Sequence, residues 1–196
     1  MADISIEQIK KLKELSGVGL TDAKNALVEA KGDFDKALEA MRKKGLTKAE
    51  KRGDRETREG LVDSYIHDGR IGAIVEVNCE TSFVAKTDEF RDLAHKIAMQ
   101  VASMAPLYVS LDSIPEDVRA AKLQELESNF KGPENMKAQI LEGQIKKSFS
   151  DKVLLLQPYI LDDSKTVEQY IKDCIAKTGE NITVRQFKRI ELGVTE

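Results

Sequence analysis

The residues best suited to chemistry lie in one short segment, from Glu76 to Phe90. Cys79 stands beside Glu80 there, with His67 upstream and His95 downstream. A cysteine nucleophile needs a base, a group that orients the base, and donors that bind the oxyanion. His67 is expected at a hairpin turn that points away from Cys79, and His95 falls on a helix beside an apolar stripe. Because cysteine is often buried as a small hydrophobic side chain, we favour a structural role for Cys79 over thiol catalysis.

The same segment places two apolar residues, Phe83 and Val84, in a small polar turn between a strand and a helix. They could pack beneath the preceding hairpin as part of the core. They could also protrude and act as a wedge against another protein. Taken alone, the residues favour packing beneath the hairpin, because large apolar side chains are usually buried.

The composition is that of a folded protein and excludes several classes of function. Of the 196 residues, 41% are hydrophobic and 33% charged, and the net charge is −3. Tryptophan is absent and aromatic residues make up 5%, so no stacking platform for nucleic acid is expected. No stretch approaches the roughly 18 apolar residues of a membrane span, and the N-terminus lacks an export signal, which predicts a cytoplasmic protein.

The sequence offers no motif for a bound cofactor or metal. It contains no phosphate loop, no GxGxxG placed after a strand and no Cys/His cluster with metal-binding spacing. The two cysteines, Cys79 and Cys174, are expected to be reduced thiols. We therefore expect neither a cofactor nor a metal site.

Residues 1–46 carry the signals of a small three-helix domain. Expected N-caps precede each helix: Ser5 (in a capping box with Gln8), Thr21 and Asp33. Gly32 should end the second helix and Gly45 the third. The apolar residues of these two helices repeat with helical spacing: Ala23, Ala26, Leu27 and Ala30, then Phe34, Ala37, Leu38 and Met41. The pattern is similar to that of a ubiquitin-associated domain, whose most exposed apolar feature would be the Gly17–Leu20 turn.

Residues 47–59 are nearly all charged and are predicted to form a solvated helical linker. Three pairs of opposite charge support this prediction at i, i+4 spacing: Arg52 with Glu56, Asp54 with Arg58, and Arg55 with Glu59. Since the acids roughly balance the bases, the segment is not expected to bind nucleic acid.

Residues 60–196 are predicted to form an α+β body. Two β-rich runs flank Asp68–Gly69, a strong hairpin signal, and Thr87 should cap a long apolar-striped helix that ends before Pro106. The later elements are expected to be helices beginning near Pro115, after Gly132–Pro133 and after Thr166, a strand around Pro158, and a final strand, ITVRQFKRIEL. Because strands and helices do not alternate regularly, the body should be an antiparallel sheet with packed helices.

Two segments resemble the signatures of the elongation factor Ts family: LKELSGVGLTDAKNAL, from Leu12 to Leu27, and EVNCETSFVAK, from Glu76 to Lys86. The resemblance covers nearly the whole chain and is closest to the short form of the family. It implies a guanine-nucleotide exchange factor, without covalent chemistry of its own, for the translational GTPase elongation factor Tu. The chain would bind the GDP form of that partner and promote release of GDP so that GTP can bind.

The resemblance also implies a site. The turn that matches Thr81, Ser82, Phe83 and Val84 dislodges Mg²⁺ in the family, because the matching phenylalanine presses between histidine-bearing helices of the GTPase domain. Residues that match Leu20, Thr21 and Lys24 in the N-terminal domain bind another helix of the same GTPase domain. The wedge interpretation of Phe83 is then favoured, while Val84 could still be core.

The chain departs from the family at Ser82, where an aspartate is usual. Serine can still bond within a turn, so we expect exchange activity to be retained with a changed contact to the partner. The residues leave the oligomeric state open, although short members of the family tend to pair as homodimers. Lys188 aligns with a bridging cysteine of some relatives, so a covalent dimer is not expected.

Three functions remain to be compared: an exchange factor for a GTPase, a ubiquitin- or peptide-type binding module on an unrelated α+β body, and a cysteine hydrolase that uses Cys79. The two signature segments, in order along the chain, favour the exchange factor.

Overall fold

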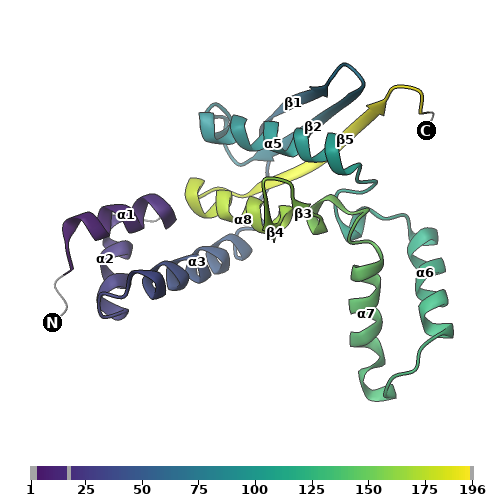
Figure 1. Ribbon diagram of the computed structural model, residues 1–196, viewed down its shortest axis with the longest axis horizontal. Coiled ribbons are helices and arrows are strands. Elements are labelled where there is room, and N and C mark those ends of the chain that lie inside the picture. Colours follow the sequence, from purple (N-terminus) through teal and green to yellow (C-terminus); the bar gives the residue numbers. More distant parts are fainter. Residues whose placement is uncertain (1–3, 17–18, 195–196) are drawn as a thin grey trace. The chain divides into compact units, whose positions relative to one another are not determined.

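The computed structural model describes residues 4–16 and 19–194 (Figure 1). The chain divides into two compact units. The first consists of Met1–Val62, Glu76–Ala94 and Gln169–Thr183, and the second of Asp63–Val75, His95–Glu168 and Val184–Glu196. Helices come first along the chain and an antiparallel sheet with packed helices follows, so the predicted α+β class is confirmed.

The N-terminal helices form a bundle with a core of its own. They are α1 (Ile6–Ser16), α2 (Leu20–Glu29) and α3 (Phe34–Glu50). Their buried residues form one cluster: Leu12, Ala23, Ala26, Leu27, Ala37 and Met41. The predicted capping box is confirmed, because the Ser5 amide donates to Gln8 Oε1 at 3.0 Å and the Gln8 amide donates to Ser5 Oγ at 3.1 Å. Asp33 caps α3 by accepting from the Lys36 amide at 3.1 Å.

The start of α2 differs from the prediction. The helix begins at Leu20 with Gly19 as its N-cap, so Thr21 lies in the first turn and does not cap it. Of the expected Gly17–Leu20 turn, Gly17 and Val18 lie outside the described residues.

The prediction that Gly45 ends the third helix is wrong, because α3 continues through it to Glu50. Gly45 is buried, and a Cβ added there would lie 3.1 Å from Cβ of Ala176 in α8 (Val167–Thr178). Glycine in a helix costs about 1 kcal/mol relative to alanine. Its role here is close packing against another helix.

The charged segment after the bundle is not a helix beyond Glu50. Residues 51–55 form turns, and Arg55 pairs with Glu80 at 3.3 Å instead of with Glu59. Arg58 pairs with Glu56, two residues away, at 2.9 Å. The i, i+4 prediction fails because Glu80, from a distant part of the sequence, offers Arg55 a carboxylate that is only 22% exposed.

The main sheet has three strands in the order β1-β2-β5. Their bounds are Glu59–His67, Ile71–Cys79 and Ile182–Glu191. Asp68 (φ 48°) and Gly69 (φ 65°) are both left-handed, as in the two-residue hairpin turn predicted for them. At this same end of the sheet, just before β2 begins and just after β5 ends, the Leu192 amide donates to the Arg70 carbonyl at 2.8 Å, which fits antiparallel strands.

Helix α5 (Asp88–Met104) is capped as predicted, since the Phe90 amide donates to Thr87 Oγ1 at 3.3 Å. Its whole apolar stripe is buried: Phe90, Leu93, Ala94, Ile97, Ala98, Val101 and Ala102. In the second unit, His95 on this helix meets the ring of Tyr65 on β1 edge-on, with centroids 5.9 Å apart. The stripe accounts for why this helix could be predicted from sequence spacing alone.

The predicted strand around Pro158 is mostly absent. Leu154–Leu156 form a short 3₁₀ helix (η3), and only Pro158–Tyr159 (β3) pair, antiparallel, with Asp162–Thr166 (β4). The chain turns at Gln157, which is buried and donates from Nε2 to the carbonyls of Asp151 at 2.7 Å and Met104 at 3.2 Å.

A pair of helices, α6 (Glu116–Ser128) and α7 (Lys137–Ser148), belongs to the second unit (Figure 1). Two short 3₁₀ helices precede them, η1 (Leu111–Ser113) and η2 (Glu134–Met136). An apolar cluster lies at their base: Ile114, Ile145, Phe149 and Val153. Among the described residues, no helix is long and apolar enough to cross a bilayer.

Gly60 provides a test of how closely β1 and β2 approach each other. Its φ is +151°, and an added Cβ would lie 2.2 Å from the Val77 carbonyl oxygen and 2.8 Å from Asn78 Cα. Gly60→Ala should therefore lower the free energy of unfolding by about 2 kcal/mol or more. Gly72→Ala on β2 is the matched control, because nothing lies within 4 Å of the added Cβ. Equal midpoints of urea unfolding for the two variants would contradict this account.

Candidate functional site

A four-residue helix, α4 (Ser82–Ala85), follows β2 and carries the residues of the predicted wedge. Thr81 is its N-cap, and Thr81 Oγ1 accepts a hydrogen bond from the Val84 amide at 3.4 Å. Val84 and Ala85 are buried, whereas the Phe83 side chain is 80% exposed. The helix is thus anchored on one side and presents an aromatic ring to solvent on the other.

The two apolar residues of the turn therefore differ in their exposure to solvent. The interpretation that Phe83 packs beneath the hairpin is wrong, whereas Val84 is buried, as expected of a core residue. Ser82 is exposed, and the cap that a residue at this position was expected to supply comes from Thr81 instead. The shape of the turn accordingly does not depend on the Ser82 side chain.

Cys79 lies beneath this turn as a protonated thiol. It is fully buried, and its Sγ donates to the Thr81 carbonyl at 3.2 Å. Burial, with a further contribution from the Glu180 carboxylate, raises the pKa of Cys79 to about 11. A thiol is nucleophilic as the thiolate, so the environment of Cys79 opposes the hydrolase interpretation.

The two histidines have contacts of their own within the second unit. His67 Nδ1 lies 3.1 Å from the Tyr65 hydroxyl, and His95 Nδ1 lies 3.4 Å from Asp63 Oδ2. In the part of the chain that the structure describes, no three His, Cys, Asp or Glu side chains are placed to hold a metal ion.

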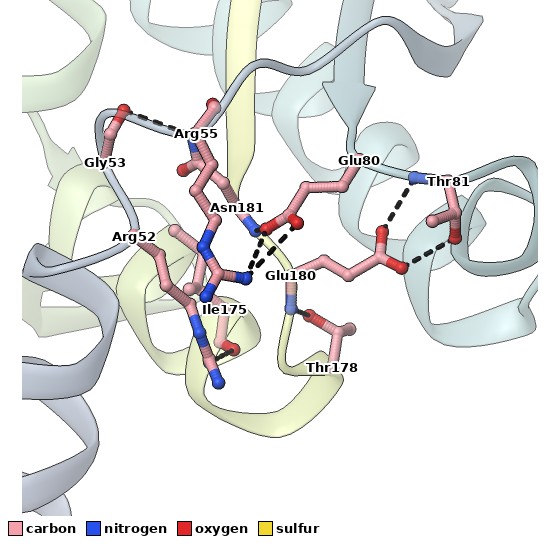
Figure 2. Close-up of polar contacts among 9 residues, drawn as sticks. All are labelled: Arg52, Gly53, Arg55, Glu80, Thr81, Ile175, Thr178, Glu180 and Asn181. Atoms are coloured by element: carbon pink, nitrogen blue, oxygen red, sulfur yellow. Dashed lines mark hydrogen bonds and ion pairs between the residues drawn. The ribbon is translucent and has the colours of Figure 1, made fainter.

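A set of polar residues, here called the polar brace, holds the residues before α4: Arg55, Glu80, Thr81, Glu180 and Asn181. Figure 2 shows Glu180 reaching Thr81 with both carboxylate oxygens. Oε2 accepts from the Thr81 amide at 3.0 Å, and Oε1 accepts from the Thr81 hydroxyl at 2.6 Å. The carboxylate thus binds the residue that caps the wedge helix.

The other half of the brace fixes Glu80. Its Oε1 accepts from the Asn181 amide at 2.6 Å, and Arg55 pairs with its Oε2 at 3.3 Å (Figure 2). The Asn181 side chain is buried and donates to the carbonyls of Arg55 at 2.8 Å and Gly53 at 3.2 Å. The brace cannot be predicted from local sequence patterns, because Thr81 and Glu180, like Glu80 and Asn181, are about 100 positions apart.

The predicted residues of the N-terminal bundle lie on the outer face of α2. Leu20 is 53% exposed and is the first residue of the helix. Thr21 and Lys24 are exposed as well. Since residues four positions apart share a helix face, Leu20 and Lys24 form a mixed apolar and basic surface. This surface and Phe83 lie on separate elements, α2 and α4.

Comparison with known proteins decides the family. The family model described as "Elongation factor TS" matches residues 6–194. The chain belongs to the elongation factor Ts family. A relative from Thermotoga maritima named elongation factor Ts is 48% identical over 193 residues, which are 97% of each chain. Another, from Rippkaea orientalis, is 49% identical over 98% of this chain and 80% of its own length.

The family assignment confirms the function that the signature segments predicted. Members of this family are translation elongation factors that serve nucleotide exchange on elongation factor Tu. The alternative of a ubiquitin- or peptide-type binding module on an unrelated body is not favoured, because the match extends through both the N-terminal bundle and the α+β body.

The state of Cys79 can be tested by alkylation. In a Cys174→Ser variant, Cys79 should react very slowly with iodoacetamide near pH 7, and its rate should rise about tenfold per pH unit up to its pKa of about 11. Because folding raises this pKa from 9.0, the contribution of the protonated thiol to stability is complete below pH 9 and is lost as the pH rises to about 11. Rapid labelling at pH 7, followed by mass spectrometry, would contradict the assignment.

Proposed function

We propose that the chain accelerates GDP release from elongation factor Tu by pressing Phe83 into the GTPase domain, which displaces a helix that helps to hold the partner's Mg²⁺. The proposal places this action in the cytoplasm and requires no contact with nucleic acid. The observation that carries it is the 80% exposure of Phe83 directly beside the buried Val84. An isolated exposed apolar residue is common, but this one stands on a short helix that is anchored through its cap and its buried side.

The free energy gained by burying Phe83 limits how far this residue alone can accelerate GDP release. A GTPase holds GDP through phosphate-binding amides and Mg²⁺, and an exchange factor must offset what the partner loses with them. Burying one phenylalanine contributes about 1.5–3 kcal/mol, which corresponds to a factor of roughly ten to a hundred. Linkage requires that the nucleotide weakens the exchange factor as much as the factor weakens the nucleotide. Larger accelerations therefore need further contacts.

The exposed face of α2 is the proposed source of some of those contacts. Leu20, Thr21 and Lys24 would bind a second helix of the same GTPase domain. The body of the chain would pack against the neighbouring domains of the partner. We expect these surfaces to set how tightly the two proteins associate, while the wedge sets how fast GDP leaves after association.

Exchange kinetics with fluorescent GDP test this division directly. Phe83→Ala should lower the maximal rate of GDP release by about ten- to a hundredfold, since one buried aromatic contact is lost. Leu20→Ala should instead raise the half-saturating concentration of the factor by about three- to tenfold, with little change in the maximal rate. Both are read from the dependence of the release rate on the concentration of the factor.

Leu161→Ala is the control for the loss of an exposed apolar side chain, because Leu161 is 55% exposed and lies between β3 and β4. It should match the unmodified chain in both parameters. A Phe83→Ala variant that releases GDP as fast as the unmodified chain would exclude the wedge mechanism. A chain that does not accelerate release at all would exclude the exchange function.

Ser82 tests recognition separately from shape. Because Ser82 is exposed and Thr81 supplies the cap, Ser82→Asp should leave the unfolding midpoint unchanged. The added carboxylate should lower the half-saturating concentration by up to about fivefold, the range of an exposed ion pair worth up to about 1 kcal/mol. Ser82→Asn has nearly the same shape without the charge and should have no such effect. A slower release with Ser82→Asp would mean that serine suits this partner better.

A further inference from the structure

We infer that Glu180 is a positioning residue for nucleotide exchange, which acts by holding Thr81 so that α4 presents Phe83 to the partner. This inference rests on the proposed function and adds to it a residue that lies outside both signature segments. Glu180 does not itself need to touch the partner. Its two carboxylate oxygens bind the amide and the hydroxyl of Thr81 (Figure 2).

The first reason is that α4 cannot hold its own conformation. Forming the first turn of a helix is unfavourable, and a helix gains stability only as it lengthens. With four residues, α4 depends on contacts made outside it. Val84 and Ala85 supply apolar contacts below the helix, and the cap at Thr81 fixes where the helix begins.

The second reason is the arrangement of bonds around the Thr81 hydroxyl. The oxygen accepts from the Val84 amide at 3.4 Å, and the hydroxyl donates to Glu180 Oε1 at 2.6 Å. A hydroxyl has one proton and two lone pairs, so donation to Glu180 leaves a lone pair to face the helix. Hydrogen bonds in such a chain strengthen each other, and a charged acceptor strengthens them further. Glu180 therefore acts on the cap of α4 as well as on the loop before it.

The third reason is that the brace extends the pairing of β2 and β5 past the end of the sheet. The Thr81 amide donates to the Glu180 side chain, and the Asn181 amide donates to the Glu80 side chain. Thr81 is thus joined to Glu180 and Glu80 to Asn181, just beyond the residues where β2 ends and β5 begins. Asn181 is in turn fixed to residues 53–55 through its side chain. Both sides of the Glu80–Thr81 peptide are held, and Phe83 follows two residues later.

A loop that already has its binding geometry before it contacts the partner promotes exchange more effectively than a loop that adopts this geometry only part of the time. If only a fraction of the molecules has the competent loop, the effect of the wedge falls by that fraction. Removing the Glu180 carboxylate should therefore slow GDP release after the complex has formed. Initial association depends on other surfaces and should not change.

The test compares Glu180→Ala, Glu180→Gln and a control, Glu142→Ala, which removes an exposed acid from α7. The maximal rate of release of fluorescent GDP should fall about tenfold in Glu180→Ala, with an unchanged half-saturating concentration. Glu180→Gln keeps an acceptor for the Thr81 amide and should restore most of the rate. Hydrogen exchange at the amides of Thr81 and Val84 should be faster in Glu180→Ala and close to normal in Glu180→Gln and Glu142→Ala.

These readouts separate positioning from a loss of stability. Partial unfolding lowers the concentration of active protein, so it raises the apparent half-saturating concentration and leaves the maximal rate unchanged. That pattern in Glu180→Ala, or an unchanged maximal rate with unchanged hydrogen exchange, would overturn the inference. If the unmodified chain did not accelerate GDP release, the proposed function would fail, whereas the hydrogen-exchange comparison would still report whether Glu180 holds the loop.

Discussion

An aromatic side chain that is to enter another protein must stay exposed in water while the backbone beneath it stays fixed. Phe83 meets this requirement on a helix that is too short to be stable alone. Its conformation is imposed from outside, by the burial of Val84 below, by the Cys79 thiol bonded to the Thr81 carbonyl, and by the Glu180 carboxylate bonded to Thr81. The exposed ring and the contacts that hold its helix are therefore parts of one arrangement.

Because these contacts lie within the chain, the loop loses its conformational entropy when the chain folds and not when it binds the partner. A flexible loop would lose its conformational freedom on binding, and the partner contacts would have to offset that loss. A loop ordered on folding loses it once, when the large apolar core of the chain forms around residues such as Phe90 and Val77. More of the free energy gained when the ring is buried can then oppose the binding of nucleotide. On the proposed mechanism, the polar contacts between Thr81 and Glu180 contribute to exchange by holding the loop, although they do not need to touch the partner.

Interactions between residues close in sequence could be predicted, and interactions between distant residues could not. Ser5, Asp33 and Thr87 bond to amides three residues away, and Asp68–Gly69 forms a hairpin within itself, so local patterns sufficed for all of them. Gly45 and Arg55 were misinterpreted because their partners, Ala176 and Glu80, are distant in sequence. The exposure of Phe83 could not be derived from its neighbours either, and only the resemblance to a family favoured it.

The same distinction explains why the chain can carry serine at position 82, where the resemblance to the family leads us to expect aspartate. Within the turn, the residues that hold the backbone, the capping Thr81 and the buried Val84, flank Ser82 and Phe83, whose side chains are exposed. A change at an exposed position leaves the cap, the buried contact and the Glu180 bonds in place. Because Thr81 and Val84 set the shape of the turn, a change at position 82 alters the surface that the turn presents while Phe83 keeps its orientation.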